Sequence, residues 1–492
     1  MSLNDAPGAG TEEGWPSRRV GTERAGHLRD LSMRSGAYLM FRGGIGIAIR
    51  LCGILLVTRL IGPYAFGLYA SAAAFVAVVA TISQMGVEVY LIRLGTEPAE
   101  RTYRTAFTLL LAISLFATGA GIAATYVVGA LMHSPPYLAA LRVLLISVPV
   151  NVCWAPAQAR IERRFQYRKM AALEIVGDAV LYATSVPLAA LGAGVWAPTI
   201  GFVAWQTFLF FASLWLAEMA PALAWDWSEV RRILRFGAGY SLTASVASLV
   251  GLVNPLVVGH FSGPRGVGYV SLTQRILTTL GFVNQAAWRL ATVAFGRIGD
   301  DRARLRRGIE EAMRLQVLVL GVLLGAFATF SAIVVPLVFG HAWTGIVAIY
   351  PVLALAAMVS AACLVPQSLL YARDRNYVVA LSQAAVLAIL VPTAWVLTAH
   401  FGLLGFGVAF LLSRLGLLVI VTVSYGIVKY TYEGTIVWTC ALAPILFAES
   451  VPGPWRPLLF VPAIVVATLP FGRHQIAEYS RVILSSFRRQ LT

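Results

Sequence analysis

The chain has 492 residues, of which 59% are hydrophobic and 12% are charged, and its formal net charge at pH 7 is +16. Soluble domains carry about 25% charged residues, so this composition excludes a globular enzyme with one membrane anchor and indicates a polytopic membrane protein. The positive charge lies in short segments between apolar runs, which is typical of membrane orientation and argues against nucleic acid as a partner.

Apolar runs long enough to cross a bilayer follow one another from Tyr38 onward. A polar cytoplasmic tail at 1–37 precedes six runs, which form an N-lobe at 38–217, and a polar linker at 218–235 leads to six more runs, which form a C-lobe at 236–428. Two shorter runs at 429–470 predict a C-terminal transmembrane hairpin, and 471–492 form a second polar tail. The expected fold class is an all-α polytopic membrane protein with twelve transmembrane helices, plus the two of the short hairpin.

Arginine and lysine are distributed very unequally between alternate loops. With the N-terminus in the cytoplasm, the outer loops contain only Arg265 and Arg456, and all the other loop cations fall on the inner side. Cytoplasmic loops carry the excess of Lys and Arg, so both termini are predicted to be cytoplasmic. The outer loops are also too short to contain a catalytic domain.

A GPxxxG motif occurs twice at a constant offset, each time between two apolar runs. The two copies are Gly62, Pro63 and Gly67, and then Gly263, Pro264 and Gly268. Proline fixes φ and glycine tolerates a tight turn, so each copy predicts a helical hairpin with almost no loop. Because each lobe has an even number of runs, the lobes are predicted to be parallel repeats around a central cavity, with the two hairpins bounding its outer gate.

Ionisable side chains inside apolar runs are candidate site residues, because each costs ~2.5–3.5 kcal/mol at the membrane centre. Arg50, Arg275 and Arg414 lie deep in their runs. Facing lobes would bring Arg50 and Arg275 to one cavity, where guanidinium groups bind anions such as phosphate; internal salt bridges are the alternative. The other cavity candidates are Arg42, Arg59, Arg289, Gln84 and Gln285, of which the first two lie near the ends of runs and are equally explained by snorkelling.

Two acidic residues, Glu174 and Asp178, stand at i and i+4 and share one helix face. They are candidates for carrying a coupling ion, H⁺ or Na⁺, or for neutralising Arg50. For Glu174 the interpretation that we favour is an interfacial partner of Arg168 or Lys169.

A third acidic candidate, Glu88, lies one turn before Arg93, which predicts an interfacial salt bridge. The four cysteines are scattered through separate runs, and the chain contains no metal-ligand spacing, nucleotide-binding motif or catalytic motif. The sequence therefore predicts no metal site, no cofactor and no enzymatic activity.

Several stretches of the two lobes carry a recognisable pattern. They are LLVTRLIGPYAFGLYASAAAFV with QMGVEVYLIR behind it, the stretch 163–201 (RRFQYRKMAALEIVGDAVLYATSVPLAALGAGVWAPTIG), YARDRNYVVALS and GLLGFGVAFLLSR. In order and spacing they resemble the polysaccharide and O-antigen flippases of the multidrug/oligosaccharidyl-lipid/polysaccharide (MOP) exporter superfamily. The resemblance extends over roughly 38–429, nearly the whole membrane part.

This resemblance implies a protein of the bacterial plasma (inner) membrane that flips an undecaprenyl-diphosphate-linked oligosaccharide from the inner to the outer leaflet, for exopolysaccharide, capsule or O-antigen synthesis. It implies alternating access with an arginine-lined cavity, in which Arg50 and Arg275 bind the diphosphate. Membrane lipids and polysaccharide polymerase or export proteins are the implied partners. Relatives dedicated to the peptidoglycan precursor have a sodium-site acid in the second half that has no evident counterpart here, so the coupling ion stays open.

Other functions compete with this interpretation. A drug or metabolite exporter of the same superfamily typically takes cations, which several unpaired arginines would repel. A membrane polysaccharide polymerase would need a sizeable outer loop or a carboxylate pair near the surface, and the sequence shows neither. A scaffold in an envelope complex would have no use for buried arginines. The flippase is therefore the function that the sequence predicts.

Overall fold

The computed structural model describes residues 22–95, 97–132, 135–281, 302–373, 375–470, 472, 473 and 475. Regular structure within these residues is helical, and nine helices of this part are long and apolar enough to cross a membrane. The protein is thus an all-helical polytopic membrane protein, as the apolar runs predict.

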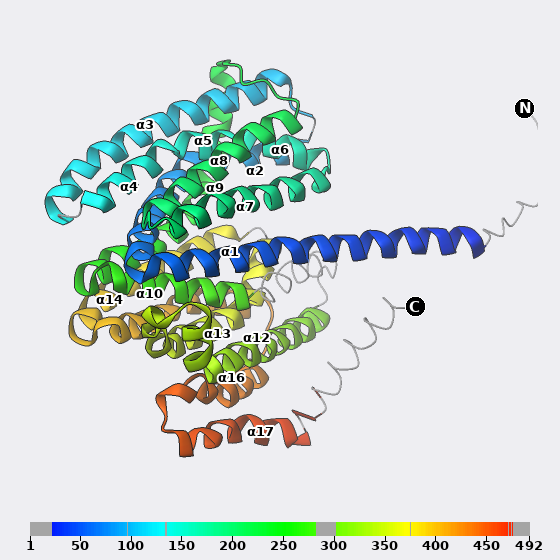
Figure 1. Ribbon diagram of the computed structural model, residues 1–492. Coiled ribbons are helices and arrows are strands. Elements are labelled where there is room, and N and C mark those ends of the chain that lie inside the picture. Colours follow the sequence, from blue (N-terminus) through cyan, green and yellow to red (C-terminus); the bar gives the residue numbers. More distant parts are fainter. Residues whose placement is uncertain are drawn as a thin grey trace, which may run out of the picture.

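Helices of the first half form one group, seen in the upper part of Figure 1. They are α1 (Thr22–Gln84), α2 (Val87–Arg93), α3 (Glu100–Met132), α4 (Pro135–Ile146), α5 (Val148–Cys153), α6 (Ala155–Arg163), α7 (Tyr167–Ala190) and α8 (Trp196–Leu216). The predicted fourth run is divided into α4, α5 and α6 because Pro149 and Pro156 each start a new helical segment.

Helices of the second half form the other group. They are α9 (Trp227–Val253), the π-helix η1 (Asn254–Val258), α10 (Gly259–Leu280), α12 (Arg302–Val338), η2 (His341–Trp343), α13 (Gly345–Ala372), α14 (Asn376–Leu412), η3 (Ser413–Leu417), α15 (Leu418–Ile427), α16 (Glu433–Leu446), η4 (Ala448–Ser450), η5 (Gly453–Phe460) and α17 (Val461–Thr468). The predicted hairpin at 429–470 thus contains the short helices α16, η5 and α17.

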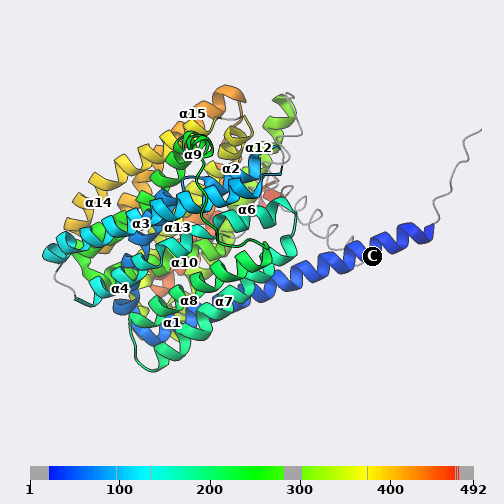
Figure 2. The same ribbon diagram turned by 90° about the horizontal axis from the view of Figure 1, so that it is seen from above.

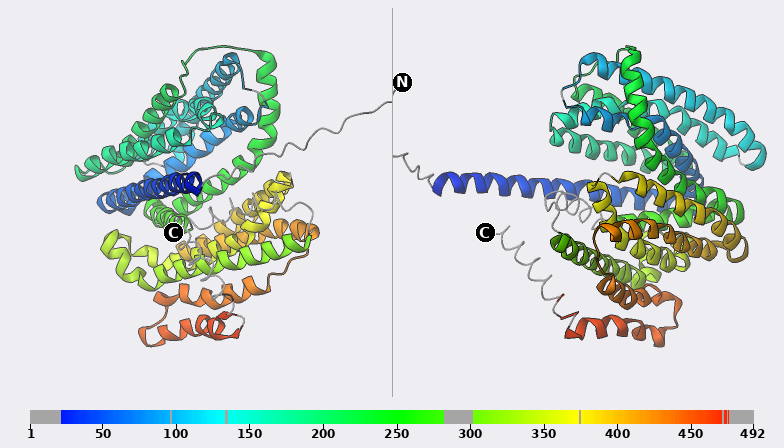
Figure 3. Two further views of the ribbon diagram at one scale, coloured as in Figure 1. Left: turned by 90° about the vertical axis from the view of Figure 1, so that its right-hand side faces the viewer. Right: turned by 180° about the vertical axis from the view of Figure 1, so that it is seen from behind.

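The first segment of α1 lies between the two groups, and its N-terminal part extends well beyond both (Figures 1, 2 and 3). Residues 22–37, which the sequence assigns to the polar tail, continue this helix. The stretch contains no proline that would stop the helix, and its Arg, Leu and Ala residues favour helix.

Each half has a hydrophobic core. The first core gathers side chains from Leu68 to Met219 together with Val230 and Ile233 of α9, and the second gathers Phe66 and side chains from Val253 to Leu446. Phe66 follows the first GP turn and yet belongs to the second core, so the two halves meet at this turn. We keep the names N-lobe and C-lobe for the two halves.

Both GP motifs form the predicted tight turn. Gly62 has φ 73° and ψ 173°, and Gly263 has φ 68° and ψ −176°, with helix directly before and after each. This region of backbone space is open to glycine, and the proline that follows begins the next helical segment without needing an N–H partner. The repeated motif therefore produces the same sharp bend in both lobes.

Candidate functional site

A cavity of about 580 Å³ lies between the lobes. The second segment of α1 (63–84), α5 and α8 form its N-lobe wall, and α9, η1 and α10 form its C-lobe wall. Alanines at 70, 73, 74, 77 and 80 recur along the α1 wall, and their small side chains leave room between the helices.

Among the described residues that line this cavity, Arg275 of α10 is the one that carries a charge. The other polar lining residues are Tyr69, Thr81, Gln84, Asn151, Gln206, Asn254, Ser271 and Gln274. The Asn254 Nδ2 donates to Ser271 Oγ over 3.0 Å, which joins η1 to α10. The described part of the lining thus offers a permanent cation beside many amide and hydroxyl groups, a set that suits an anion attached to a hydroxyl-rich molecule.

Arg50 does not line this cavity but forms an ion pair on its N-lobe side. Its Nε contacts Asp178 Oδ2, and its Nη2 lies 4.0 Å from Glu174 Oε2. Both carboxylates belong to one face of α7, one turn apart. The Asp178 side chain is 8% exposed and that of Arg50 is 51% exposed, so the buried partner of this pair is the carboxylate. The structure therefore has the internal salt bridge that the sequence left as the alternative to a free anion ligand.

Tyr182, one turn beyond Asp178 on α7, connects this ion pair to the cavity. Its buried side chain lies within electrostatic reach of Arg50, Asp178 and Arg275. A Cβ on Gly53 would lie 2.1 Å from the Tyr182 ring, so this ring packs directly on the backbone of α1. Arg50 and Arg275 thus belong to one polar cluster that bridges the lobes, although only Arg275 faces the cavity.

The two GP motifs pack against each other at one end of the cavity. A Cβ on Gly67 would lie 1.7 Å from the Pro264 carbonyl oxygen, and a Cβ on Gly268 would lie 2.2 Å from the Pro63 carbonyl oxygen. The contact is reciprocal, as expected for equivalent positions of a repeat. Only glycine permits so close an approach of two backbones, so these residues close the GP-turn end of the interface between the lobes.

The C-lobe also holds the first segment of α1 beside this contact. The Trp343 Nε1 donates to the Thr58 carbonyl over 3.0 Å, and its ring packs edge-on to Phe66. Arg59 Nη1 donates to the Leu337 carbonyl over 2.7 Å, at the last turn of α12. Arg59, a predicted cavity residue, is therefore not among the described residues that line this cavity; its guanidinium caps a helix end, where carbonyls lack intrahelical partners.

Arg414 also lies away from the cavity, inside the C-lobe. Its guanidinium stacks on the Phe410 ring, 4.1 Å from the centroid, and its Nε donates to the Phe410 carbonyl over 3.2 Å. Arg414, also a predicted cavity residue, is therefore not among the described residues that line this cavity, because the depth of a residue along a helix does not determine which side of the helix it faces.

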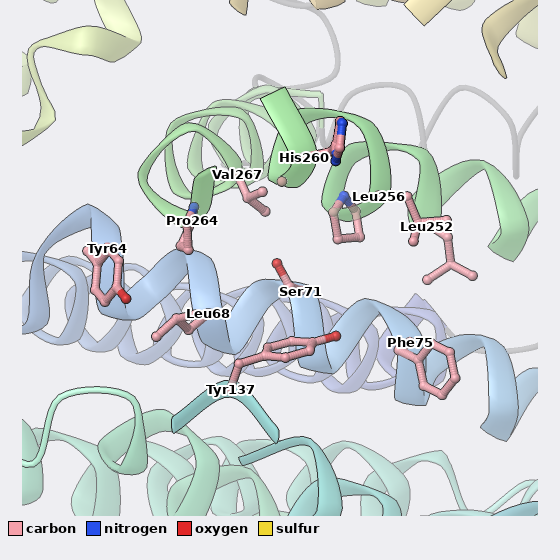
Figure 4. A pocket seen from close by; sticks show the side chains of 12 residues that line it. Tyr64, Leu68, Ser71, Phe75, Tyr137, Leu252, Leu256, His260, Pro264 and Val267 are labelled. Carbon is pink, nitrogen blue, oxygen red and sulfur yellow. The ribbon is translucent and has the colours of Figure 1, made fainter. Parts of the chain in front are cut away.

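A second interlobe cavity, of about 340 Å³, lies next to the GP contact and is mostly apolar. Figure 4 shows Leu68, Ser71 and Phe75 of α1 opposite Leu252 and Leu256 of the C-lobe. Pro255 lines both cavities, so the polar site and this apolar groove adjoin.

A model of a family described as polysaccharide biosynthesis protein matches residues 56–348, more than half of the chain. The chain belongs to this polysaccharide biosynthesis protein family. It is 22% identical over 310 residues to the succinoglycan biosynthesis transport protein ExoT of Rhizobium meliloti (strain 1021), and the match covers 62% of this chain and 61% of ExoT. It is 21% identical over 336 residues to the lipopolysaccharide biosynthesis protein WzxC of Escherichia coli (strain K12), covering 68% of this chain and 67% of WzxC.

Solved structures agree on the fold of this polysaccharide biosynthesis protein. The lipid II flippase MurJ in an inward closed conformation has a TM-score of 0.71 at 13% identity, covering 91% of this chain and 99% of MurJ. An inward-facing multidrug resistance MATE family transporter of the MOP superfamily has a TM-score of 0.61 at 15% identity, covering 79% of this chain and 98% of the transporter. The fold is that of the MOP superfamily, and the homologues are transporters, not enzymes.

Not every predicted site residue of this family member can be placed. Gln285, Arg289 and the side chain of Arg42 lie outside the described residues. Glu88 forms no ion pair with any residue that the structure describes, and the charge near it is the like charge of Glu162. The structure does not form the predicted Glu88–Arg93 salt bridge: both residues lie on α2, but a spacing of five residues turns their side chains about 140° apart around the helix.

Sequence reasoning did not identify most of the uncharged polar residues of the cavity. Asn151, Gln206, Asn254 and Gln274 line it, and Gln84 is the one amide that was predicted among the described residues. An amide side chain inside an apolar run was the available signal. This signal is weaker for amides than for arginines, because an uncharged polar group costs less free energy to bury in a membrane span.

Proposed function

We propose that this protein translocates an undecaprenyl-diphosphate-linked oligosaccharide from the inner to the outer leaflet of the bacterial plasma membrane. Membership of the polysaccharide biosynthesis family supports the pathway. The observation that carries the proposal is the interlobe cavity, where the described lining residues combine the guanidinium of Arg275 with amide and hydroxyl groups. A guanidinium binds a diphosphate, and amides bind sugar hydroxyls.

We assign the membrane topology as follows. Gly62, Gly263 and Gly402 each have positive φ and each divide one of the nine long apolar helices, so these helices supply twelve crossings. Counted without this division, the three apolar stretches Ile49–Arg93, Ala244–Leu280 and Asn376–Ile427 contain 45, 37 and 52 residues. Each is far longer than the ~20 residues that one crossing needs. The short α16 and η5–α17 form the remaining hairpin. The excess of arginine in alternate loops supports cytoplasmic termini and an outer position for the GP turns.

Transport then proceeds by rocking of two parallel lobes around the cavity. In the present state the GP turns close the outer end through Gly67 and Gly268. The diphosphate enters from the inner leaflet and meets Arg275, while the lipid tail stays in contact with the bilayer. The lobes then separate at the GP turns and close below, so that the glycan faces the outer side, where a polymerase or export protein receives it.

Arg50 takes part through exchange of its partner. In this state Asp178 and Glu174 neutralise it, and half of its side chain is exposed. An arriving diphosphate competes with Asp178 for this guanidinium, because both are anions that accept its hydrogen bonds. A proton or sodium ion on the freed carboxylates would then couple transport to an ion gradient.

A sidedness assay of the lipid-linked oligosaccharide pool tests this proposal. In a strain in which this protein is the sole route of export, Arg275→Gln is expected to trap glycan-charged lipid in the cytoplasmic leaflet. Arg414→Gln is the matched control, because it removes an arginine that does not line the cavity, and we expect export at or near the wild-type rate. If the lipid reaches the outer leaflet unpolymerised in a strain that lacks the protein, its function lies after translocation and the proposal is wrong.

A further inference from the structure

A separate cavity of about 440 Å³ lies at one end of the C-lobe. Arg302, Arg373 and Arg375 line it together with Leu305, Ile427 and Val428. It lies where α12 and α14 begin and α15 ends, remote in sequence from every residue that lines the central cavity. By the arginine distribution, this end of the C-lobe faces the cytoplasm.

The site combines the N-terminus of α14 with cationic side chains. Arg375 is the N-cap residue of α14, and Arg302 lies on α12. A helix N-terminus carries about half a positive charge, and its first N–H groups lack partners within the helix. Both side chains are exposed, and neither forms an ion pair or hydrogen bond with any residue that the structure describes. The cavity is therefore equipped for an anion.

The repeat shows that the fold does not require this charge. When the sequence of 156–167 is aligned with that of 366–377, Arg163 matches Arg373 and Phe165 matches Arg375. In the N-lobe, Arg163 Nη1 donates to the carbonyls of Leu91, Ile92 and Leu94 over 2.8–2.9 Å, which fastens the loop before α3. Arg375 aligns with an uncharged residue of the N-lobe, and its side chain makes no comparable hydrogen bonds to the carbonyls of described residues.

Apolar side chains beside the arginines indicate the kind of anion. Val423 and Ile427 line the cavity and are half-buried, so part of its wall is accessible hydrocarbon. Tyr377 and Tyr425 are exposed close by in sequence, and tyrosines of this kind mark the level of the lipid headgroups. A soluble anion has no use for the hydrocarbon wall, whereas a phospholipid matches both parts of the site.

We propose that this cavity binds the phosphate headgroup of a membrane lipid, with Arg302 and Arg375 as ligands and Val423 and Ile427 in contact with the start of its acyl chain. Such a headgroup belongs either to an anionic phospholipid of the bilayer or to a polyprenyl diphosphate that approaches the protein. The proposal does not depend on the central cavity or on the transport activity.

Binding to the purified full-length protein in an uncharged detergent tests the proposal. The probes are phosphatidylglycerol, a short-chain polyprenyl diphosphate, phosphatidylcholine and inorganic pyrophosphate, each titrated with thermal unfolding and native mass spectrometry as readouts. We expect the double variant Arg302→Gln/Arg375→Gln to weaken the binding of the anionic lipids at least about tenfold. The control Arg231→Gln/Arg235→Gln removes two exposed arginines of α9 and the same charge, and should bind as the wild type does.

The probes also distinguish the two lipids that could supply the phosphate headgroup. Binding of phosphatidylglycerol identifies a bilayer lipid, and binding of the polyprenyl diphosphate alone identifies the headgroup of the transported class; either supports the site. Equal weakening in both double variants would overturn it, as would pyrophosphate binding as tightly as the lipids. The single variant Arg375→Phe introduces the N-lobe residue and should weaken binding without loss of folding. Unchanged binding in this variant would also contradict the proposal.

Discussion

Replacing Gly67 or Gly268 by alanine is expected to prevent closure of the lobes at the GP turns and to abolish transport. The new methyl group would lie 1.7 Å from the Pro264 carbonyl oxygen in the first variant and 2.2 Å from the Pro63 carbonyl oxygen in the second. Both neighbours are backbone atoms, which no rotamer change can move aside. Overpacking of this kind costs about 1–3 kcal/mol, enough to change which state of the transporter is populated.

Thiol labelling measures this effect without relying on transport. A cysteine at Gln274, which lines the cavity, is labelled from outside by a membrane-impermeant reagent in a background without the four native cysteines. Faster labelling is expected in Gly67→Ala and Gly268→Ala. Gly119→Ala is the matched control, because a Cβ there meets no atom within 4 Å. Labelling and transport at wild-type rates in the Gly67 and Gly268 variants would show that the GP contact is not a gate.

Arg50→Gln is expected to destabilise the protein more than Asp178→Asn does. The first change leaves a carboxylate that is 8% exposed without its partner, whereas the second leaves a guanidinium that is 51% exposed. Loss of one partner of a buried ion pair destabilises a protein by about 3–5 kcal/mol. The destabilisation by Arg50→Gln should lie at or below the lower end of this range, because water can reach Asp178 through the space that the Arg50 side chain leaves. For Asp178→Asn we expect about 1 kcal/mol.

A double-mutant cycle on unfolding in detergent isolates this pair. Arg50→Gln/Asp178→Asn should recover part of the stability that Arg50→Gln loses, which gives a coupling energy of about 1 kcal/mol or more. Glu174→Gln, at 4.0 Å from Arg50, should show much weaker coupling. Strictly additive losses would mean that the Arg50–Asp178 contact does not hold α1 to α7.

The fold was predictable because it follows from strong local signals. Apolar runs of bilayer length specify the spans, and the Gly62–Pro63 and Gly263–Pro264 pairs allow few conformations other than a tight turn. The extension of α1 back to residue 22 was not predictable in this way, because polar residues with good helix propensity remain helical only where their surroundings permit it.

The site was predictable only in part. Sequence position gives the depth of Arg59 and Arg414 along their helices but not the direction in which they point, and both turn to carbonyls or an aromatic ring of the C-lobe. The partner of Arg50 depends on how α1 packs on α7, which a single sequence does not reveal. The backbone contacts of Gly67 and Gly268 likewise arise only when the lobes meet. Arg275 and Gln84 were identified because a polar side chain inside an apolar run is costly to bury, and both line the cavity between the two halves.

Translocation by the purified protein tests the central claim most directly. Proteoliposomes containing wild type, Arg275→Gln or Arg414→Gln would be loaded with a lipid-linked oligosaccharide carrying a fluorescent label on its glycan, and an impermeant quencher would report the leaflet that it occupies. We predict that wild type and Arg414→Gln move the label across the bilayer, while Arg275→Gln does so at least about tenfold more slowly. Equal rates in Arg275→Gln and wild type, or no movement with wild type, would contradict the assignment of this cavity as the path of the diphosphate-linked glycan.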